Sequence, residues 1–156
     1  MRVGFGYDSH RFVPGRPLIV GGVNLVFDKG LEGWSDADVL THAIIDALCG
    51  ASTLDDIGVL FPPGDERYRN ASSLDLLRTV VQQVEAEGFR ILNVDSVVIA
   101  ERPVMAPYVG EMRTTLAEVL RVDPANLSIK PKTAEGMGAV GRGEGIVAYA
   151  VVLVDS

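Results

Sequence analysis

The segment from Gly145 to Val154 is almost wholly apolar, and it constrains the fold more than any other part of the chain. Its main part reads IVAYAVVLV. Because successive side chains of a β-strand point to opposite faces, a strand that is apolar at every position is predicted to be buried on both. A chain of 156 residues has few helices with which to cover two faces of a sheet. We therefore infer that part of this sheet lies at a subunit interface, the alternative being an ordinary central strand.

Strand and helix patterns alternate along the chain, which is typical of the α/β or α+β class. We predict strands over residues 2–12, 89–101, 127–133 and 145–154, and a hairpin over 16–27 that turns at Gly21-Gly22. Helices are predicted over residues 35–49, 72–87 and 107–121. Ser35 is the expected N-cap of the first helix and Gly50 its stop. Residues 51–71 are expected to be irregular, and residues 1–156 to form a single domain.

The charge balance limits the partners of the chain. Fourteen Lys and Arg against twenty-one Asp and Glu give a net charge of −7. No basic stripe is present, so the sequence argues against nucleic-acid binding, and an anionic ligand would need a divalent cation. Cys49 is the only cysteine, which excludes an intrachain disulfide and favours a core position. No signal peptide or membrane-spanning run is found, so we expect a cytoplasmic protein without membrane contact.

The only two histidines of the chain form part of a candidate metal site. Asp8 and His10 are two residues apart on a predicted strand, so both side chains leave the same face. His42 lies on the first predicted helix, with Asp38 and Asp46 one turn away on either side. Two nitrogens and one oxygen leave a fourth position open, as in catalytic zinc sites, and Asp38 or Asp46 could orient a ligating ring. The alternatives are a surface Asp–His pair and a hydrogen-bonded core histidine.

A second group of residues, near the C-terminus, suits phosphate. In IKPKTAEGMGAVGRGEGI, Lys130, Lys132 and Thr133 precede a run of glycines that contains Arg142. Ammonium, guanidinium, hydroxyl and exposed backbone N–H groups are what a diphosphate needs, and Glu135 could hold a bridging cation. The spacing is not that of a P-loop. The alternative is a glycine-rich turn in which Arg142 pairs with Glu144.

The irregular segment LDDIGVLFPPGD carries Asp55, Asp56 and Asp65 around Gly58. Carboxylates held in a rigid loop can accept hydrogen bonds from a sugar or polyol. The alternative is a solvated connection between two helices.

Five ordered blocks of the sequence resemble one known family. The blocks GYDSHRF, WSDADVLTHAIIDALCGA, DIGVLFP, NVDSVVIAERP and KTAEGMGAVGRGEGI are similar to those of the 2-C-methyl-D-erythritol 2,4-cyclodiphosphate synthases of the non-mevalonate isoprenoid pathway. The similarity spans essentially the whole chain. It implies a homotrimer with active sites between subunits. It also implies a mixed four-stranded main sheet covered by helices on one face, with the three sheets packed around a three-fold axis.

The resemblance further implies an activity. Members of the family convert 4-diphosphocytidyl-2-C-methyl-D-erythritol 2-phosphate into the cyclic diphosphate and CMP. The substrate supplies its own nucleophile, so positioning and charge neutralisation would carry the catalysis. Two other functions use the same ligands and stay open at this point: a metal-dependent phosphodiesterase or nucleotide hydrolase, and a non-catalytic trimeric metal-binding scaffold.

The resemblance also implies the roles of individual residues. Asp8, His10 and His42 match the zinc ligands, and Glu135 matches the position beside a second cation, Mg²⁺ or Mn²⁺. Thr133 and Trp34 match positions that act on the reacting phosphates, although the family commonly has His at position 34. Val104 replaces a frequent lysine and Ala139 a common aromatic residue. The implied substrate contacts are Asp8, Ser9, His10, Trp34, Ser35, Asp56, Ile57, Gly58, Phe61, Pro62, Pro63, Gly64, Asp65, Ala100, Glu101, Arg102, Pro103, Val104, Met105, Ala106, Lys132, Thr133, Ala134, Glu135, Ala139 and Arg142.

Overall fold

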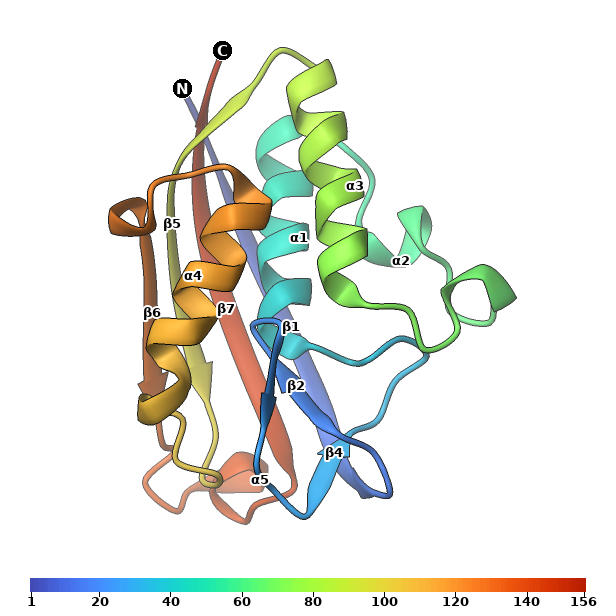
Figure 1. The fold of residues 1–156 in the computed structure, drawn as a ribbon, viewed down its shortest axis with the longest axis vertical. Coiled ribbons are helices and arrows are strands. Elements are labelled where there is room, and N and C mark those ends of the chain that lie inside the picture. Colours follow the sequence, from blue (N-terminus) through green and yellow to red (C-terminus); the bar gives the residue numbers. More distant parts are fainter.

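The computed structural model describes residues 1–156, and its elements alternate as the sequence predicts (Figure 1). The strands are β1 (Arg2–Pro14), β2 (Leu18–Val20), β3 (Val23–Leu25), β4 (Lys29–Leu31), β5 (Arg90–Ile99), β6 (Leu127–Lys132) and β7 (Gly145–Asp155). The α-helices are α1 (Val39–Ser52), α2 (Ile57–Leu60), α3 (Ser73–Ala86), α4 (Val109–Leu120) and α5 (Gly138–Gly141). Short 3₁₀ turns are η1 (Glu66–Tyr68), η2 (Ala106–Tyr108) and η3 (Pro124–Asn126). No helix has both the length and the apolar character that crossing a bilayer requires.

The main sheet is mixed and has five strands in the order β4-β1-β7-β5-β6. β7 is antiparallel to both β1 and β5, whereas β5 and β6 run parallel. The expectation of four strands is wrong, because β4 pairs with the end of β1 from Phe12 to Pro14. β4 consists of three residues, Lys-Gly-Leu, which is too short for an alternating pattern to reveal it. The predicted hairpin is confirmed as β2 and β3, and Gly21 and Gly22 both have positive φ at its turn.

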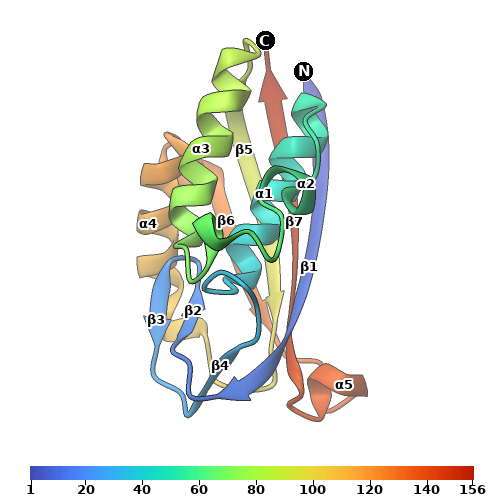
Figure 2. The same ribbon diagram turned by 90° about the vertical axis from the view of Figure 1, so that its right-hand side faces the viewer.

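Helices α1, α3 and α4 cover one face of this sheet only (Figure 2). Along β7 the buried and exposed side chains alternate, with Ala148 and Ala150 inside and Tyr149 and Val151 outside. The expectation that this strand is buried on both faces is therefore wrong for the single chain. Its outward residues form an open apolar face with neighbours on β1 and β5, which consists of Val3, Phe5, Tyr7, Val97, Ile99, Val147, Tyr149, Val151 and Leu153.

Two glycines let β1 pack directly on α1. A Cβ built on Gly6 would lie 1.8 Å from the Ala43 carbonyl oxygen, and one on Gly4 would lie 1.8 Å from that of Ala47. Only glycine allows two backbones to approach this closely. The contact fixes where α1 sits relative to β1, and so where His42 sits relative to Asp8.

Helix α1 begins and ends later than predicted. Ala37 has φ of 58°, a left-handed conformation that no helix contains, so the helix starts after it with Asp38 as N-cap. The Asp38 carboxylate accepts the N–H of Thr41 at 3.0 Å. Ser35 is therefore not the cap. At the other end Gly50 lies inside the helix, which closes at Thr53 in the left-handed region.

Candidate active site

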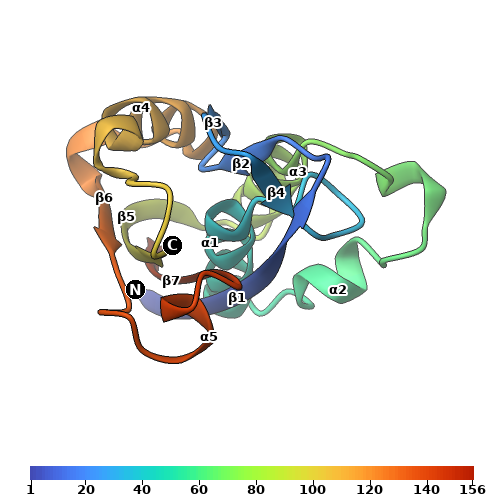
Figure 3. The same ribbon diagram turned by 90° about the horizontal axis from the view of Figure 1, so that it is seen from below.

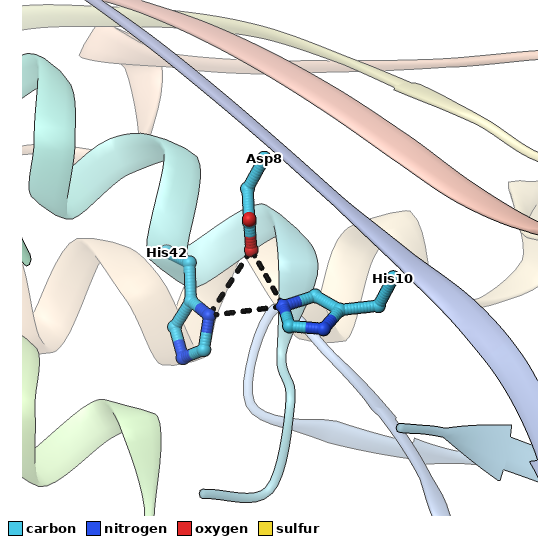
Figure 4. Close-up of side chains that lie close together, drawn as sticks. All are labelled: Asp8, His10 and His42. Carbon is cyan, nitrogen blue, oxygen red and sulfur yellow. Dashed lines mark hydrogen bonds and ion pairs between the residues drawn. The ribbon is translucent and has the colours of Figure 1, made fainter. Parts of the chain in front are cut away.

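Three ligand atoms converge beside the start of α1 (Figure 4). Asp8 and His10 extend from the same face of β1, as their spacing predicts, and His42 extends from α1. The Asp8 Oδ2 atom lies 2.8 Å from His10 Nε2 and 3.1 Å from His42 Nδ1, and the two ring nitrogens are 3.3 Å apart. The three side chains thus share one small volume.

The donor set and its spacing fit a tetrahedral metal ion. With bonds of about 2.0–2.1 Å, neighbouring ligand atoms of tetrahedral zinc stand about 3.3 Å apart, close to the separations found here. The charges agree with this. Burial alone would raise the pKa of Asp8, but hydrogen bonds from His10 and His42 lower it to about 2. Conversely, burial lowers the pKa of His10, but the Asp8 carboxylate outweighs burial and raises it above 6.5. In the absence of a metal, the contacts of Asp8 with His10 and His42 keep the three side chains together where a cation would bind.

The imidazole rings of His10 and His42 are oriented by groups other than the predicted Asp38 and Asp46. His10 Nδ1 donates to the Glu32 carbonyl at 2.7 Å, and His42 Nε2 lies 2.7 Å from the Ser73 hydroxyl. The Asp38 carboxylate instead accepts hydrogen bonds from the N–H groups of Gly21 and Gly22 and from that of Thr41, which it caps. The Asp46 carboxylate accepts the Ile57 N–H at 2.9 Å. The prediction that Asp38 or Asp46 accepts a ring N–H is therefore wrong. Both carboxylates are held by backbone donors.

A cavity of about 210 Å³ opens beside the three ligands. The predicted residues that line it are Asp8, His10, His42, Trp34, Ser35, Ile57, Gly58, Phe61 and Pro63, joined by Tyr68 and Leu76. The Trp34 indole N–H donates to the Asp65 carbonyl at 2.7 Å and so ties this loop down. Because that donor is engaged, any phosphate contact at this position falls to the backbone or to the Ser35 hydroxyl.

The predicted cytidine and diphosphate segments meet each other but not the metal ligands. Glu101 accepts the N–H groups of Ala134 and Gly136 at 3.1 and 3.2 Å, and the Ala100 N–H donates to the Lys132 carbonyl. These segments follow β5 and β6, whereas Asp8 lies on β1. On neighbouring strands, Asp8 lies opposite Ala148, Ala148 lies opposite Val98, and Val98 lies opposite Pro131. Three strand spacings, or about 14 Å, separate the two groups within one chain.

The remaining predicted residues lie elsewhere. Arg142 pairs with Glu144 at 2.8 Å, which is the alternative reading of the glycine-rich turn, and Lys130 pairs with Asp95 at 2.7 Å. Ser9 and Ala139 line a hollow of about 840 Å³ on the open side of the sheet, where α5 lies (Figure 3). The remaining loop residues, Asp56, Pro62, Gly64 and Asp65, belong to the segment beside the small cavity without lining it.

Comparison with known proteins decides the family. Residues 1–155 match the model of the YgbB family. A 2-C-methyl-D-erythritol 2,4-cyclodiphosphate synthase from Dehalococcoides mccartyi (strain CBDB1) is 54% identical over 155 residues, which cover 99% of each chain. One from Symbiobacterium thermophilum is 56% identical over 154 residues, covering 99% of this chain and 98% of the relative. The chain belongs to the 2-C-methyl-D-erythritol 2,4-cyclodiphosphate synthase family.

A solved structure supports the same conclusion. A 2C-methyl-D-erythritol-2,4-cyclodiphosphate synthase in its CDP-bound form has a TM-score of 0.91 and 37% identity, covering 99% of this chain and all of the other. The chain is therefore an enzyme of the non-mevalonate isoprenoid pathway with cyclodiphosphate synthase activity. This answers the two alternatives left open by the sequence, the hydrolase and the non-catalytic scaffold.

Sequence reasoning missed several groups around the ligands of this synthase. Ser73 and the Glu32 carbonyl contact the two rings, and Tyr68 and Leu76 line the cavity. Ser73 was predicted only as part of the helix over residues 72–87. A backbone carbonyl carries no sequence signal at all, and Ser73 is 31 residues from the ring that it contacts.

Proposed function

We propose that Asp8, His10 and His42 bind a zinc ion, and that the chain thereby converts 4-diphosphocytidyl-2-C-methyl-D-erythritol 2-phosphate into the cyclic diphosphate and CMP. The observation that carries this proposal is the convergence of three ligand atoms, separated by 2.8 to 3.3 Å, in the wall of a cavity. Three protein ligands leave a coordination position for a phosphate oxygen.

The reaction requires no nucleophile from the protein. A 2-phosphate oxygen of the substrate forms a bond to the β-phosphorus of its diphosphate, and the bond from that phosphorus to the bridging oxygen breaks, so CMP leaves. Holding the attacking oxygen and the phosphorus in line contributes up to about 7–11 kcal/mol. Zinc, when bound, supplies Lewis-acid neutralisation of phosphate charge.

The residues around the small cavity would hold the methylerythritol phosphate. Ser35 Oγ accepts the Ala37 N–H at 3.2 Å, which leaves its own proton free for a phosphate oxygen. Asp56 uses Oδ1 to cap α2 at Val59, so its other oxygen can accept a substrate hydroxyl. Ile57 and Phe61 supply apolar wall. This division suits a ligand that is a polyol on one side and a methyl-bearing carbon on the other.

The second group would hold the diphosphate and the cytidine. Thr133 Oγ1 accepts the Glu135 N–H at 3.3 Å, so its proton can be donated to an oxygen whose charge changes in the transition state. Glu135 is an exposed single carboxylate. Mg²⁺ is commonly bound by one or two carboxylates together with substrate phosphates, so Mg²⁺ or Mn²⁺ fits here. The segment from Ala100 to Ala106 would receive the cytidine.

The active site is proposed to form between subunits of a homotrimer. The two groups of residues lie at different edges of the sheet, and one substrate must touch both. The open apolar face formed by β1, β5 and β7 gives the chain a surface to bury against copies of itself. Packing of such faces around a three-fold axis would bring the Thr133 group of one chain to the metal ligands of the next.

Replacement of His42 tests the zinc role. We expect His42→Ala to lose zinc and to lower the rate of cyclisation by on the order of 10³-fold, because one of three ligands and several kcal/mol of charge stabilisation disappear. Zinc is measured by elemental analysis, and CMP and cyclic product by mass spectrometry.

Cys49→Ala is the matched control, because Cys49 is also buried on α1 but forms no hydrogen bond with the three ligands. It should retain zinc and activity. CMP release at the normal rate by His42→Ala in chelated buffer would count against the proposal.

A further inference from the structure

Ser73 links the metal ligand His42 to a carboxylate on a different segment. It is the first residue of α3 and is fully buried. Its hydroxyl hydrogen-bonds Asp36 Oδ1 on one side and lies 2.7 Å from His42 Nε2 on the other. Its backbone N–H donates to Asp36 Oδ2 at 2.9 Å. The serine is therefore fixed at two points by one carboxylate.

The direction of these hydrogen bonds follows from the atoms involved. Both oxygens of an ionised carboxylate can only accept, so the single Ser73 hydroxyl proton goes to Asp36. The Ser73 oxygen must then accept from His42, which requires a proton on Nε2. A neutral imidazole has only one N–H, so a proton on Nε2 leaves the lone pair on Nδ1. In the metal-free protein the Asp8 carboxylate, 3.1 Å from Nδ1, competes with Ser73 for that proton. Nδ1 is the atom that faces Asp8 and His10.

We propose that Ser73, held by Asp36, is a positioning residue that keeps His42 in the tautomer with hydrogen on Nε2 and so presents Nδ1 to the metal. The proposal rests on the proposed zinc site. Ser73 acts through the ring and needs no contact with substrate. The Glu32 carbonyl acts on His10 in the same way. It can only accept, so it favours a proton on Nδ1 and leaves Nε2 to bind the metal.

Ser35 is a weaker candidate for this role. Its oxygen lies 3.3 Å from His42 Nε2, against 2.7 Å for Ser73, and it already accepts the Ala37 N–H. No carboxylate contacts the Ser35 hydroxyl to fix the direction of its proton. Ser35 is left free for the phosphate role proposed above.

The tautomer of His42 in the metal-free protein tests the proposal directly. Nitrogen-15 shifts and couplings of the ring distinguish the two tautomers at a pH where the ring is neutral. We expect a larger share of the tautomer with hydrogen on Nε2 in the unmodified chain than in Ser73→Ala, where only Asp8 still attracts the ring proton. The same ratio of the two tautomers in both chains would overturn the proposal, whether or not zinc binds.

Zinc affinity gives a second readout. Loss of a hydrogen-bond partner behind a metal-ligating histidine costs about 10–100-fold in affinity, and we expect Ser73→Ala to weaken zinc binding by that factor in a chelator competition. Ser52→Ala is the matched control, because Ser52 is also buried but its hydroxyl has no partner. Equal zinc affinity of the two variants would overturn the proposal.

The two measurements separate this proposal from the zinc site itself. If the unmodified chain binds no zinc, the zinc role fails and the tautomer measurement alone decides about Ser73. If Ser73→Ala does not fold, Asp36→Asn gives the same comparison, because it removes the carboxylate that fixes the direction of the Ser73 proton.

Discussion

The three ligands differ in how much of their environment can be predicted from sequence. Asp8 and His10 are brought together by the two-residue period of one strand, so their pairing follows from spacing alone. His42 joins them only because α1 packs on β1 at Gly4 and Gly6. Ser73 and Glu32, which hold the rings, come from two further segments. Each added partner depends on tertiary packing that no local pattern reports.

The Asp8–His10 pair predicts that zinc binding at the proposed site depends on pH. Zinc needs the neutral imidazole, and the Asp8 carboxylate raises the pKa of His10 above 6.5. Below that pKa a proton must leave before the metal binds, so affinity should fall by up to about tenfold per pH unit.

The dependence is measured as the zinc dissociation constant between about pH 5.5 and about pH 8.5, a range that spans histidine titration. Binding should release protons, and affinity should begin to fall at a pH above 6.5. A constant affinity down through pH 6.5 would contradict the pair's role.

At the scale of elements, most of the fold could be predicted. The hairpin, the strands β1, β5, β6 and β7 and the helices α1, α3 and α4 all lie where hydrophobic period and turn residues predict them. The errors occur at ends and in short pieces. The left-handed Ala37 moves the start of α1, and β4 is a strand only because β1 extends far enough to pair with it. Both depend on neighbours that are distant in sequence.

The contact between β1 and α1 predicts a strong effect of one methyl group. In Gly6→Ala the new Cβ would overlap the Ala43 carbonyl oxygen, so strand and helix must separate. We expect a loss of about 3 kcal/mol or more in the free energy of unfolding, and weaker zinc binding because His42 moves away from Asp8. Thermal or urea unfolding measures the loss.

Gly110→Ala is the matched control. Gly110 lies in α4 with no atom within 4 Å of the added carbon, so alanine should stabilise the chain by up to about 1 kcal/mol. Equal stability of the two variants would contradict the close approach of β1 and α1.

At the scale of the whole molecule, the single chain has two separate groups of predicted site residues and one uncovered face of its sheet. The metal ligands lie on β1 and α1, and the Thr133 group follows β6 at the far edge of the sheet. The apolar sequence of β7 predicted an interface, and its exposed Tyr149 and Val151 agree with that prediction. Composition could not indicate which residues would meet across the proposed interface, because that depends on how the copies are oriented.

Co-expression of two inactive chains tests the shared site most directly. His42→Ala lacks a metal ligand, and Thr133→Ala lacks the diphosphate contact from the other edge. If each site takes its ligands from one chain and Thr133 from the next, random assembly in equal amounts restores about one quarter of the sites. We predict that cyclic product forms at about that fraction of the normal rate, although each variant alone is inactive. Activity in the mixed trimers no greater than in the two variants alone would contradict a site formed between subunits.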